Sequence, residues 1–249
     1  MPERLIRVGV VNYLNTKPLI YGLQLPPINE KIDLVVDYPS RVAKMLINDE
    51  IDVGLIPIAA ISQLPSYHII GNYGIATDGE IASVALFSDV PMNKIKKVYL
   101  DYQSQSSVGL LKWLMKESWG INPEIIQSTD ESYRKKINGT TAGLVIGDRA
   151  LEQRKISTFI YDLGSEWRSI TGLPFVFAAW ISKKPLPGGF VKLFDKANAM
   201  GVERIDEIVE ANPFELFDLK KYYTLHLSYY LDERKRKGME LFLSCLKDA

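Results

Sequence analysis

The chain alternates short runs of apolar and β-branched residues with longer segments of helical periodicity, and this alternation constrains its fold most strongly. Alternating strands and helices are typical of α/β proteins, in which parallel sheets carry helices on both faces. Helices are predicted to begin near Pro18, Ser40 (as a cap) and Ser106, and the chain from Phe190 onward to be mostly helical. The predicted strands comprise residues 6–11, 32–37, 51–56, 67–70, 83–88, 97–101, 143–146 and 175–182.

Two apolar segments rich in strand-forming residues, 83–90 and 174–183, are candidate crossings between two lobes. A proline follows each of them closely, at Pro91 and Pro185. With two crossings, residues 1–88 and 175–249 form lobe one and residues 89–174 form lobe two. A single doubly wound sheet explains the same pattern, and 249 residues are enough for either architecture, so the pattern alone leaves both open.

The charge balance argues against nucleic acid or an anionic membrane as a partner. The chain has 30 basic and 30 acidic residues, so no long-range field attracts it to a polyanion. No run of about 18 apolar residues predicts a membrane span, and no apolar signal segment precedes the first predicted strand. We therefore expect a cytoplasmic protein that binds neither membrane nor nucleic acid.

Residues that bind metals or act as nucleophiles are scarce in this sequence. The single cysteine, Cys245, excludes an internal disulfide, and the two histidines, His68 and His226, are expected to be packing residues. The glycine-rich loops that bind nucleotides after a strand are missing, and so is the serine elbow of hydrolases. We expect neither a metal nor an organic cofactor.

The turn after the first predicted strand is a candidate ligand-binding element. It passes from Tyr13 through Asn15, Thr16 and Lys17 to a helix that begins at Pro18. In open α/β sheets, ligands bind beyond the carboxyl ends of the strands, and the free N–H groups of a helix N-terminus attract anions. Asn15 and Thr16 can donate or accept hydrogen bonds there and Lys17 adds charge, although Asn15 or Thr16 can instead serve only as a helix cap.

A second strand, polar turn and helix follow at residues 97–118, with short or amide side chains at Ser104, Gln105, Ser106 and Ser107. This turn is either a second anion-binding helix terminus or an ordinary serine-rich cap. If the two turns belong to facing lobes, the cleft between them fits a small dianion.

Two further turns contain candidate site residues. Ser83 follows the turn signal Asp78-Gly79 at the start of a presumed crossing strand, so its hydroxyl faces either the cleft or the neighbouring backbone. Gly147 ends another apolar strand and permits close approach of a ligand, and Asp148 after it is either a site residue or a helix N-cap.

These elements resemble the chorismate dehydratase family of the futalosine route to menaquinone. The resemblance extends from about Arg7 to the C-terminal helices, and its most specific blocks are the first and the last. The matching segments are residues 11–22, 52–57, 78–79 with 83–84 and 87–88, 104–111, 146–148, and 161–164 through Trp167 to 171–178.

The resemblance implies a type 2 periplasmic-binding-protein-like fold, with two α/β lobes, two crossover strands and the substrate in the cleft. It implies loss of water from chorismate to give 3-[(1-carboxyvinyl)oxy]benzoate, without a metal or organic cofactor. Asn15 and Ser83 are the expected catalytic residues. The expected substrate-binding residues are Tyr13, Thr16, Ser104, Gln105, Ser106, Ser107, Gly147 and Asp148.

One position departs from the family pattern, because Gln105 stands where the family often has arginine, a residue that binds carboxylates through two hydrogen bonds. Asn15 and Ser83 cannot act as general bases at neutral pH, so we hypothesise that the enolpyruvyl carboxylate of the substrate takes the proton. Two alternatives stay open. One is a sister enzyme of the dihydroxynaphthoate synthase type, which relies on a histidine; the other is a solute-binding protein for a small carboxylate anion.

Overall fold

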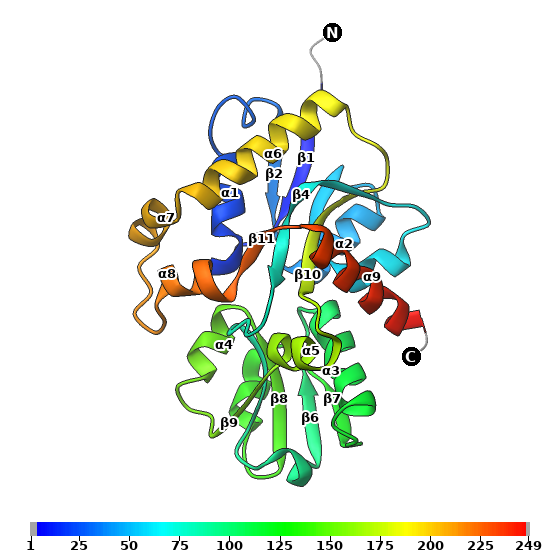
Figure 1. Cartoon of the computed structure of the whole chain (residues 1–249), viewed down its shortest axis with the longest axis vertical. Helices are drawn as coiled ribbons and strands as arrows, with labels where there is room; N and C mark the ends of the chain where they lie inside the picture. Colours follow the sequence, from blue (N-terminus) through cyan, green and yellow to red (C-terminus); the bar gives the residue numbers. More distant parts are fainter. Residues whose placement is uncertain (1–3, 248–249) are drawn as a thin grey trace.

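The computed structural model describes residues 4–247 as two lobes, each built on its own sheet (Figure 1). Lobe one has a six-stranded sheet in the order β11-β4-β10-β3-β1-β2, and lobe two has a five-stranded sheet in the order β7-β6-β8-β5-β9. The strands of lobe one are β1 (Ile6–Val10), β2 (Ile32–Val36), β3 (Val53–Pro57), β4 (His68–Thr77), β10 (Phe175–Ser182) and β11 (Ser228–Tyr230). Those of lobe two are β5 (Val84–Ser88), β6 (Lys97–Leu100), β7 (Glu124–Gln127), β8 (Thr141–Ile146) and β9 (Phe159–Asp162). The predicted two-lobed α/β architecture is thus confirmed, and the alternative of a single doubly wound sheet is excluded.

Helices cover both sheets, and several short ones lie at the junction of the lobes. Lobe one contains α1 (Lys17–Leu23), α2 (Pro39–Ile47), α6 (Gly188–Glu203), α7 (Ile205–Ala211), α8 (Leu219–Lys221) and α9 (Glu233–Lys247). Lobe two contains α3 (Gln105–Glu117), α4 (Asp148–Gln153) and α5 (Leu163–Thr171). The 3₁₀ helices are η1 (Leu14–Thr16), η2 (Ile58–Gln63), η3 (Met92–Lys94) and η4 (Glu131–Lys136), and η5 (Tyr222–His226) is a π-helix.

The chain crosses between the lobes after β4 and again before β10. The first crossing lies earlier than residues 83–90, because β5 pairs antiparallel with β8 and β9 inside the second sheet. Residues 84–88 therefore belong to lobe two. The sequence prediction, which placed them in lobe one, is wrong here. The apolar character of β5 reflects its central place between two strands, which the sequence pattern cannot distinguish from a crossing strand.

Both sheets are mixed, although the sequence favoured parallel ones. The strand β1 pairs parallel with β2 and β3, and β6 pairs parallel with β7 and β8. In contrast, β10 is antiparallel to β3 and β4, because it returns from the other lobe. The parallel strands β1, β3, β6 and β8 end at the junction, because residues at or just after their carboxyl ends, namely Val11, Pro57, Ser104 and Gly147, line the same cavity.

Two limits of helices and strands differ from the prediction, and three strands were not predicted. The strand β4 continues to Thr77, whereas the predicted strand ended at residue 70. The helix α2 begins at Pro39 after the cap residue Tyr38, so Ser40 is inside the helix and does not cap it. The short strands β7, β9 and β11 were not predicted.

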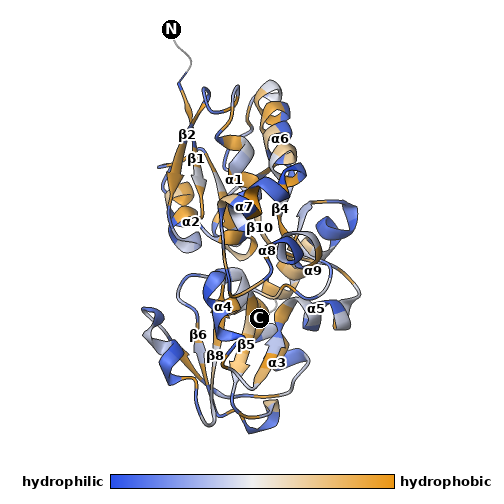
Figure 2. Cartoon of the chain, turned by 90° about the vertical axis from the view of Figure 1, so that its left-hand side faces the viewer, coloured by the Kyte–Doolittle hydropathy of each residue, from blue (hydrophilic) through white to orange (hydrophobic). Residues whose placement is uncertain are grey.

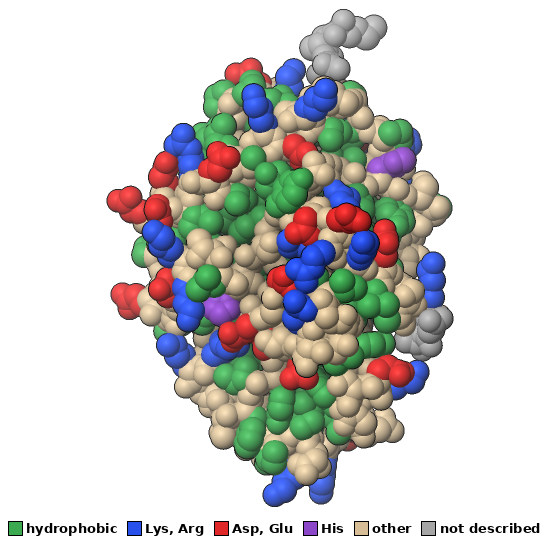
Figure 3. Space-filling model, viewed as in Figure 1, with side chains coloured by type: hydrophobic (Ala, Val, Ile, Leu, Met, Phe, Trp, Pro, Cys, Tyr) green, Lys and Arg blue, Asp and Glu red, His purple; other side chains and the backbone are tan. Residues whose placement is uncertain are grey.

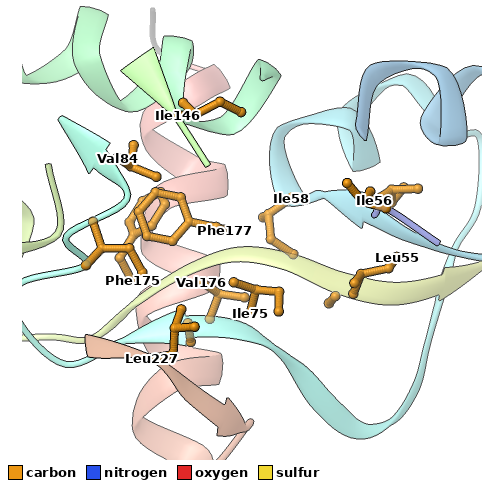
Figure 4. Packing of buried hydrophobic residues seen from close by; sticks show 14 of the residues in the cluster. Leu55, Ile56, Ile58, Ile75, Val84, Ile146, Phe175, Val176, Phe177 and Leu227 are labelled. Atoms are coloured by element: carbon orange, nitrogen blue, oxygen red, sulfur yellow. The ribbon is translucent and has the colours of Figure 1, made fainter. Parts of the chain in front are cut away.

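Most buried apolar residues of the two lobes form one large cluster, and a second, smaller cluster around Phe87 and Val145 lies in lobe two. Figure 2 shows hydrophobic residues along the strands of both lobes. Figure 4 shows Val84 and Ile146 of lobe two next to Phe177 of lobe one. On the face of the molecule that Figure 3 shows, positive and negative side chains are interspersed. No helix within residues 4–247 is long and apolar enough to cross a membrane.

Two glycines bring α1 and α6 into backbone contact. A Cβ on Gly22 would lie 1.7 Å from the carbonyl oxygen of Ala197, and a Cβ on Gly201 would lie 1.7 Å from that of Pro18. Only glycine permits this approach at either position. The contact fixes α1, and therefore the turn that precedes it, against the longest helix of lobe one.

Candidate functional site

A cavity lies between the lobes, a position at which small-molecule sites commonly form. Lobe one contributes the β1–α1 turn, the first residue of α2 and the facing parts of β3, β4 and β10. Lobe two contributes the crossing before β5, the start of α3 and the end of β8. Its lining is mainly apolar, and no Asp, Glu, Lys, Arg or His of the described chain is part of it.

Asn15 lines this cavity from the β1–α1 turn. Its side-chain oxygen Oδ1 is buried and has no hydrogen-bond partner among residues 4–247. Neither Asn15 nor Thr16 caps the helix with its side chain. The backbone is held from behind, since the Tyr229 hydroxyl donates a hydrogen bond to the Asn15 carbonyl oxygen at 3.0 Å. The capping interpretation of Asn15 is therefore wrong, and its amide is available to a ligand.

Ser83 lines the cavity from the first crossing, and its Oγ is also buried without a hydrogen-bond partner in the described part of the chain. The residue before it, Ala82, has φ +62°, which is rare for a residue with a side chain. Asp162 holds this turn, because its carboxylate accepts hydrogen bonds from the N–H groups of Ile81 at 3.0 Å and Ala82 at 2.8 Å. Strained backbone of this kind is concentrated at functional sites.

Asp162 also caps α5, accepting from the N–H groups of Gly164 and Ser165 at 3.1 Å each. Burial raises the pKa of this carboxyl, and the backbone hydrogen bonds oppose the shift. The same side chain thus terminates β9, begins α5 and fixes the position of Ser83.

Tyr13 and Gly147 meet where the lobes come together. Gly147 has φ +66° and ψ −150°, and a Cβ there would lie 3.2 Å from the Tyr13 ring. The Tyr13 hydroxyl donates to Gln103 Oε1 of lobe two. Burial raises the pKa of Tyr13, while the nearby Arg149 charge opposes the shift, so the phenol stays protonated at neutral pH.

The serine turn contributes two of its four predicted residues to the cavity. Ser104 and Ser107 line it, and Ser104 Oγ caps α3 by accepting from the Ser107 N–H at 3.1 Å. The capping interpretation is confirmed for Ser104. Ser106 Oγ instead accepts from the Ala59 N–H at 3.1 Å, and Gln105 Oε1 accepts from Gln63 at 3.1 Å. Both of these contacts join the lobes outside the cavity lining.

Thr16 and Asp148 have mainly structural contacts. Thr16 lines the cavity, but its hydroxyl donates to the backbone carbonyl groups of Val11 and Tyr13. Asp148 lies outside the lining and accepts from the Leu14 N–H at 3.0 Å, which joins α4 to the β1–α1 turn. Gly147, and not Asp148, is the residue before α4, so the predicted N-cap role is wrong. Burial raises the pKa of Asp148, and the Leu14 hydrogen bond opposes this.

A buried guanidinium near the cavity was not found from the sequence. Arg149 Nη2 donates to Asp101 Oδ2 at 3.0 Å and to Gln103 Oε1 at 2.7 Å, with the Asp101 side chain 0 % exposed. Its Nη1 is buried and has no partner among the described residues. The local sequence gave no signal for this role, because the network joins residues from the ends of β6 and β8.

Tyr222 is a second residue that the sequence did not indicate. It begins the π-helix η5, is 0 % exposed, and its hydroxyl has no hydrogen-bond partner of good geometry within the described ranges. Burial raises the pKa of Tyr222, and the adjacent Ser83 hydroxyl opposes the rise. The hydroxyl groups of Tyr222 and Ser83 therefore lie near each other.

The two histidines lie outside the cavity lining. His226 is buried and its ring contacts that of Phe217, as expected for a packing residue. His68 is exposed at the first residue of β4, beyond the part of that strand that pairs with β11, so its expected core position is wrong. Residues 4–247 contain no group of three or more His, Cys, Asp or Glu side chains that could hold a metal ion.

Solved structures with this arrangement establish the fold. A structural-genomics target protein of Archaeoglobus fulgidus is 15% identical with a TM-score of 0.76, covering 100% of this chain and 97% of its own. A Candida albicans protein described as having the generic periplasmic binding protein fold is 14% identical with a TM-score of 0.63, covering 99% and 91%. The periplasmic aliphatic sulphonate-binding protein of Escherichia coli is 14% identical with a TM-score of 0.63, covering 97% and 92%. The periplasmic-binding-protein-like fold is thereby confirmed.

Sequence comparison identifies the family. The chorismate dehydratase of Thermus thermophilus is 27% identical over 262 residues, covering 96% of this chain and 94% of the relative. Residues 6–248 match the protein family described as menaquinone biosynthesis. This match covers both lobes and every cavity-lining turn, and the chain therefore belongs to the menaquinone biosynthesis family.

Proposed function

We propose that this protein is a chorismate dehydratase, a hydro-lyase that converts chorismate to 3-[(1-carboxyvinyl)oxy]benzoate in the cavity between its lobes. The observation that carries the proposal is the pair of buried, unpartnered oxygen atoms, Asn15 Oδ1 and Ser83 Oγ, in a lining without charged residues. Leaving such atoms unpaired costs about 1–3 kcal/mol each, which a polar ligand would recover. The named Thermus thermophilus relative supports chorismate as that ligand.

The reaction removes a proton from ring carbon 3 and breaks the bond between carbon 4 and its hydroxyl oxygen. The electron pair of the C–H bond becomes part of the aromatic ring, and the hydroxyl oxygen leaves with the abstracted proton as water. The cavity lining, as far as the chain is described, offers no carboxylate or imidazole base. We therefore propose that the enolpyruvyl carboxylate of the substrate takes the proton. Asn15 and Ser83 orient the ring and polarise the leaving hydroxyl through preorganised hydrogen bonds.

Two groups support binding of the carboxylates. The N-terminus of α3, beside Ser104 and Ser107, carries free N–H groups and a positive dipole end. The buried Arg149 provides positive charge beside Tyr13 and has one unpartnered nitrogen. Gln105 is paired with Gln63, so Arg149 is the better candidate for the charge that the serine turn lacks.

The direct test is to incubate the protein with chorismate and follow the ultraviolet spectrum. A dehydratase replaces the diene absorption with that of a benzoate, whereas a solute-binding protein binds chorismate and leaves the spectrum unchanged. In Ser83→Ala and Asn15→Ala we expect kcat to fall by about 10²–10³-fold, the usual effect of removing one such polar group. An unchanged spectrum with wild-type protein at saturating chorismate would show that the proposed function is wrong.

The substrate-assisted step has its own test in Asp148→Asn. Asparagine retains an acceptor for the Leu14 N–H but cannot act as a base, so we expect turnover to continue. If turnover collapsed while chorismate still bound, Asp148 would be the proton acceptor and the substrate-assisted proposal would be wrong.

A further inference from the structure

The segment from Tyr222 to Tyr229 contacts the backbone near both cavity residues with an unpaired oxygen, Asn15 and Ser83. Tyr229 donates to the Asn15 carbonyl oxygen at 3.0 Å, and His226 Nδ1 lies 3.2 Å from the Glu80 carbonyl oxygen in the crossing that leads to Ser83. The segment begins with a π-helix, and such helices occur frequently at functional sites. One piece of the C-terminal chain therefore supports both Asn15 and the Ser83 turn.

The hydroxyl groups of Tyr222 and Ser83 are near each other, and both are buried and without a hydrogen-bond partner in the described chain. His226 of the same π-helix contacts the carbonyl oxygen of Glu80, three residues before Ser83. Because burial keeps the phenol protonated, Tyr222 always has a proton to donate. Ser83 has one proton and two acceptor positions. If its oxygen accepts from Tyr222, its own proton is free to point into the cavity.

We propose that Tyr222 is a positioning residue, whose hydroxyl donates a hydrogen bond to Ser83 Oγ in the substrate complex and thereby directs the Ser83 proton toward the hydroxyl that leaves the substrate. The inference rests on the proposed function and adds a residue that acts through Ser83. Tyr222 loses no proton in this arrangement. The proton that completes the water molecule is still the one taken from ring carbon 3.

A purely structural role for Tyr222 predicts a different result. Its hydroxyl is unpaired in the ligand-free protein, so replacing tyrosine by phenylalanine removes an unsatisfied polar group and retains the ring. Such a change is neutral or stabilising when packing is kept. Loss of turnover without loss of stability therefore separates positioning from packing.

The experiment compares Tyr222→Phe with Tyr223→Phe. Tyr223 lies in the same π-helix, 5.6 Å from the Tyr222 ring, and its hydroxyl is likewise buried and unpaired in the described structure. For Tyr222→Phe we expect kcat to fall by about 10- to 100-fold, with KM changed by less than about twofold and an undiminished melting temperature. For Tyr223→Phe we expect both constants within about twofold of wild type. Equal kcat values in Tyr222→Phe and wild type would overturn the inference.

A double-mutant cycle tests whether Tyr222 acts through Ser83. Single turnovers with enzyme in excess keep slow reactions measurable. In a Ser83→Ala background, Tyr222→Phe should cause no further loss, because the hydrogen bond it supplies has no acceptor. A loss equal to that in the wild-type background would overturn the inference. A wild-type protein that leaves chorismate unchanged would instead overturn the proposed function, and the inference with it.

Discussion

Gly147 and Ala82 both have positive φ angles at the points where the backbone of lobe two reaches the cavity. The conformation of Gly147, with ψ −150°, is accessible almost only to glycine. Ala82 adopts the left-handed conformation at a cost of about 1–2 kcal/mol, and hydrogen bonds from its N–H to Asp162 and from Arg154 to its carbonyl oxygen maintain it. The backbone conformation of Ala82 thus determines the position of Ser83, and that of Gly147 leaves room for the Tyr13 ring.

Gly147→Ala should therefore impair both stability and binding. We expect a loss of about 1–3 kcal/mol in the free energy of unfolding, because alanine is strained at this φ and ψ. The added Cβ also lies 3.2 Å from the Tyr13 ring, so the KM for chorismate should rise. Gly139→Ala is the control, since Gly139 has φ +54° with no atom within 4 Å of the new Cβ. Denaturant unfolding and steady-state kinetics should show a stability loss in both variants and a KM effect in Gly147→Ala alone.

Sequence reasoning located those cavity residues that directly follow a strand. Asn15 and Ser104 were predictable because a polar turn between an apolar strand and a helix is visible in a single segment. Arg149 and Tyr222 were not, because the neighbours that define them come from distant segments. The capping roles of Asn15 and Asp148 were ambiguous for the same reason, since only tertiary contacts decide them.

At the scale of elements, the cavity is built from strand ends that are held by tightly packed helices. The contact of α1 with α6 through Gly22 and Gly201 fixes the helix that follows Asn15. The strands that the sequence missed are all short, with four residues in β7 and β9 and three in β11. Each of them lies at the edge of its sheet and pairs with one other strand.

Gly201→Ala should destabilise the protein by about 2–3 kcal/mol, because its Cβ would overlap the Pro18 carbonyl oxygen and force the helices apart. The same movement should displace the Asn15 turn and lower kcat. Gly189→Ala on the same helix meets no atom within 4 Å and should be neutral or slightly stabilising. Thermal unfolding of both variants checks this, and equal melting temperatures would contradict the packing argument.

The Asp52 side chain, just before β3, accepts hydrogen bonds from Arg4, just before β1, and from Arg7 at the start of β1. The stability that these contacts contribute depends on pH. Burial raises the pKa of the Asp52 carboxyl, but hydrogen bonds from Arg7 and Arg4 outweigh that effect and hold the pKa at about 2. The folded pKa is below the ordinary value near 3.9, so this stabilisation is present above about pH 4 and is lost as the pH falls toward 2.

Asp52→Asn should lower the free energy of unfolding by about 1 kcal/mol at neutral pH and reduce its fall between pH 4 and 2. Glu124→Gln is a suitable control, because Glu124 forms only an exposed ion pair with Lys97. Urea unfolding across this pH range provides the measurement. An identical pH dependence in Asp52→Asn and wild type would contradict the assignment.

At the scale of the whole molecule, the two lobes are in contact on several sides of the cavity. The hydrogen bonds Leu14–Asp148, Gln63–Gln105 and Ala59–Ser106 each join one lobe to the other. They surround the cavity without lining it. We therefore expect these contacts to govern how readily the lobes separate to admit substrate.

Asp148→Ala should weaken chorismate binding by about 10-fold, because losing a hydrogen bond to a charged acceptor costs about 1.5–3 kcal/mol and favours separated lobes. Asp148→Asn retains an acceptor and should bind within about threefold of wild type. Calorimetric titration measures the affinities, and small-angle scattering measures the expansion expected for the alanine variant. Equal affinity of Asp148→Ala and wild type would exclude a role of this contact in closure.

The strand order of lobe one also determines when its sheet can form during synthesis. Both neighbours of β4 in the sheet, β10 and β11, follow lobe two in the chain, and β3 lacks one neighbour until β10 exists. The strands β5 to β9 need no residue beyond Asp162 for their pairing. On the ribosome, the inserted lobe can therefore fold first, while the apolar edge of the earlier strands stays exposed and open to chaperones or to aggregation.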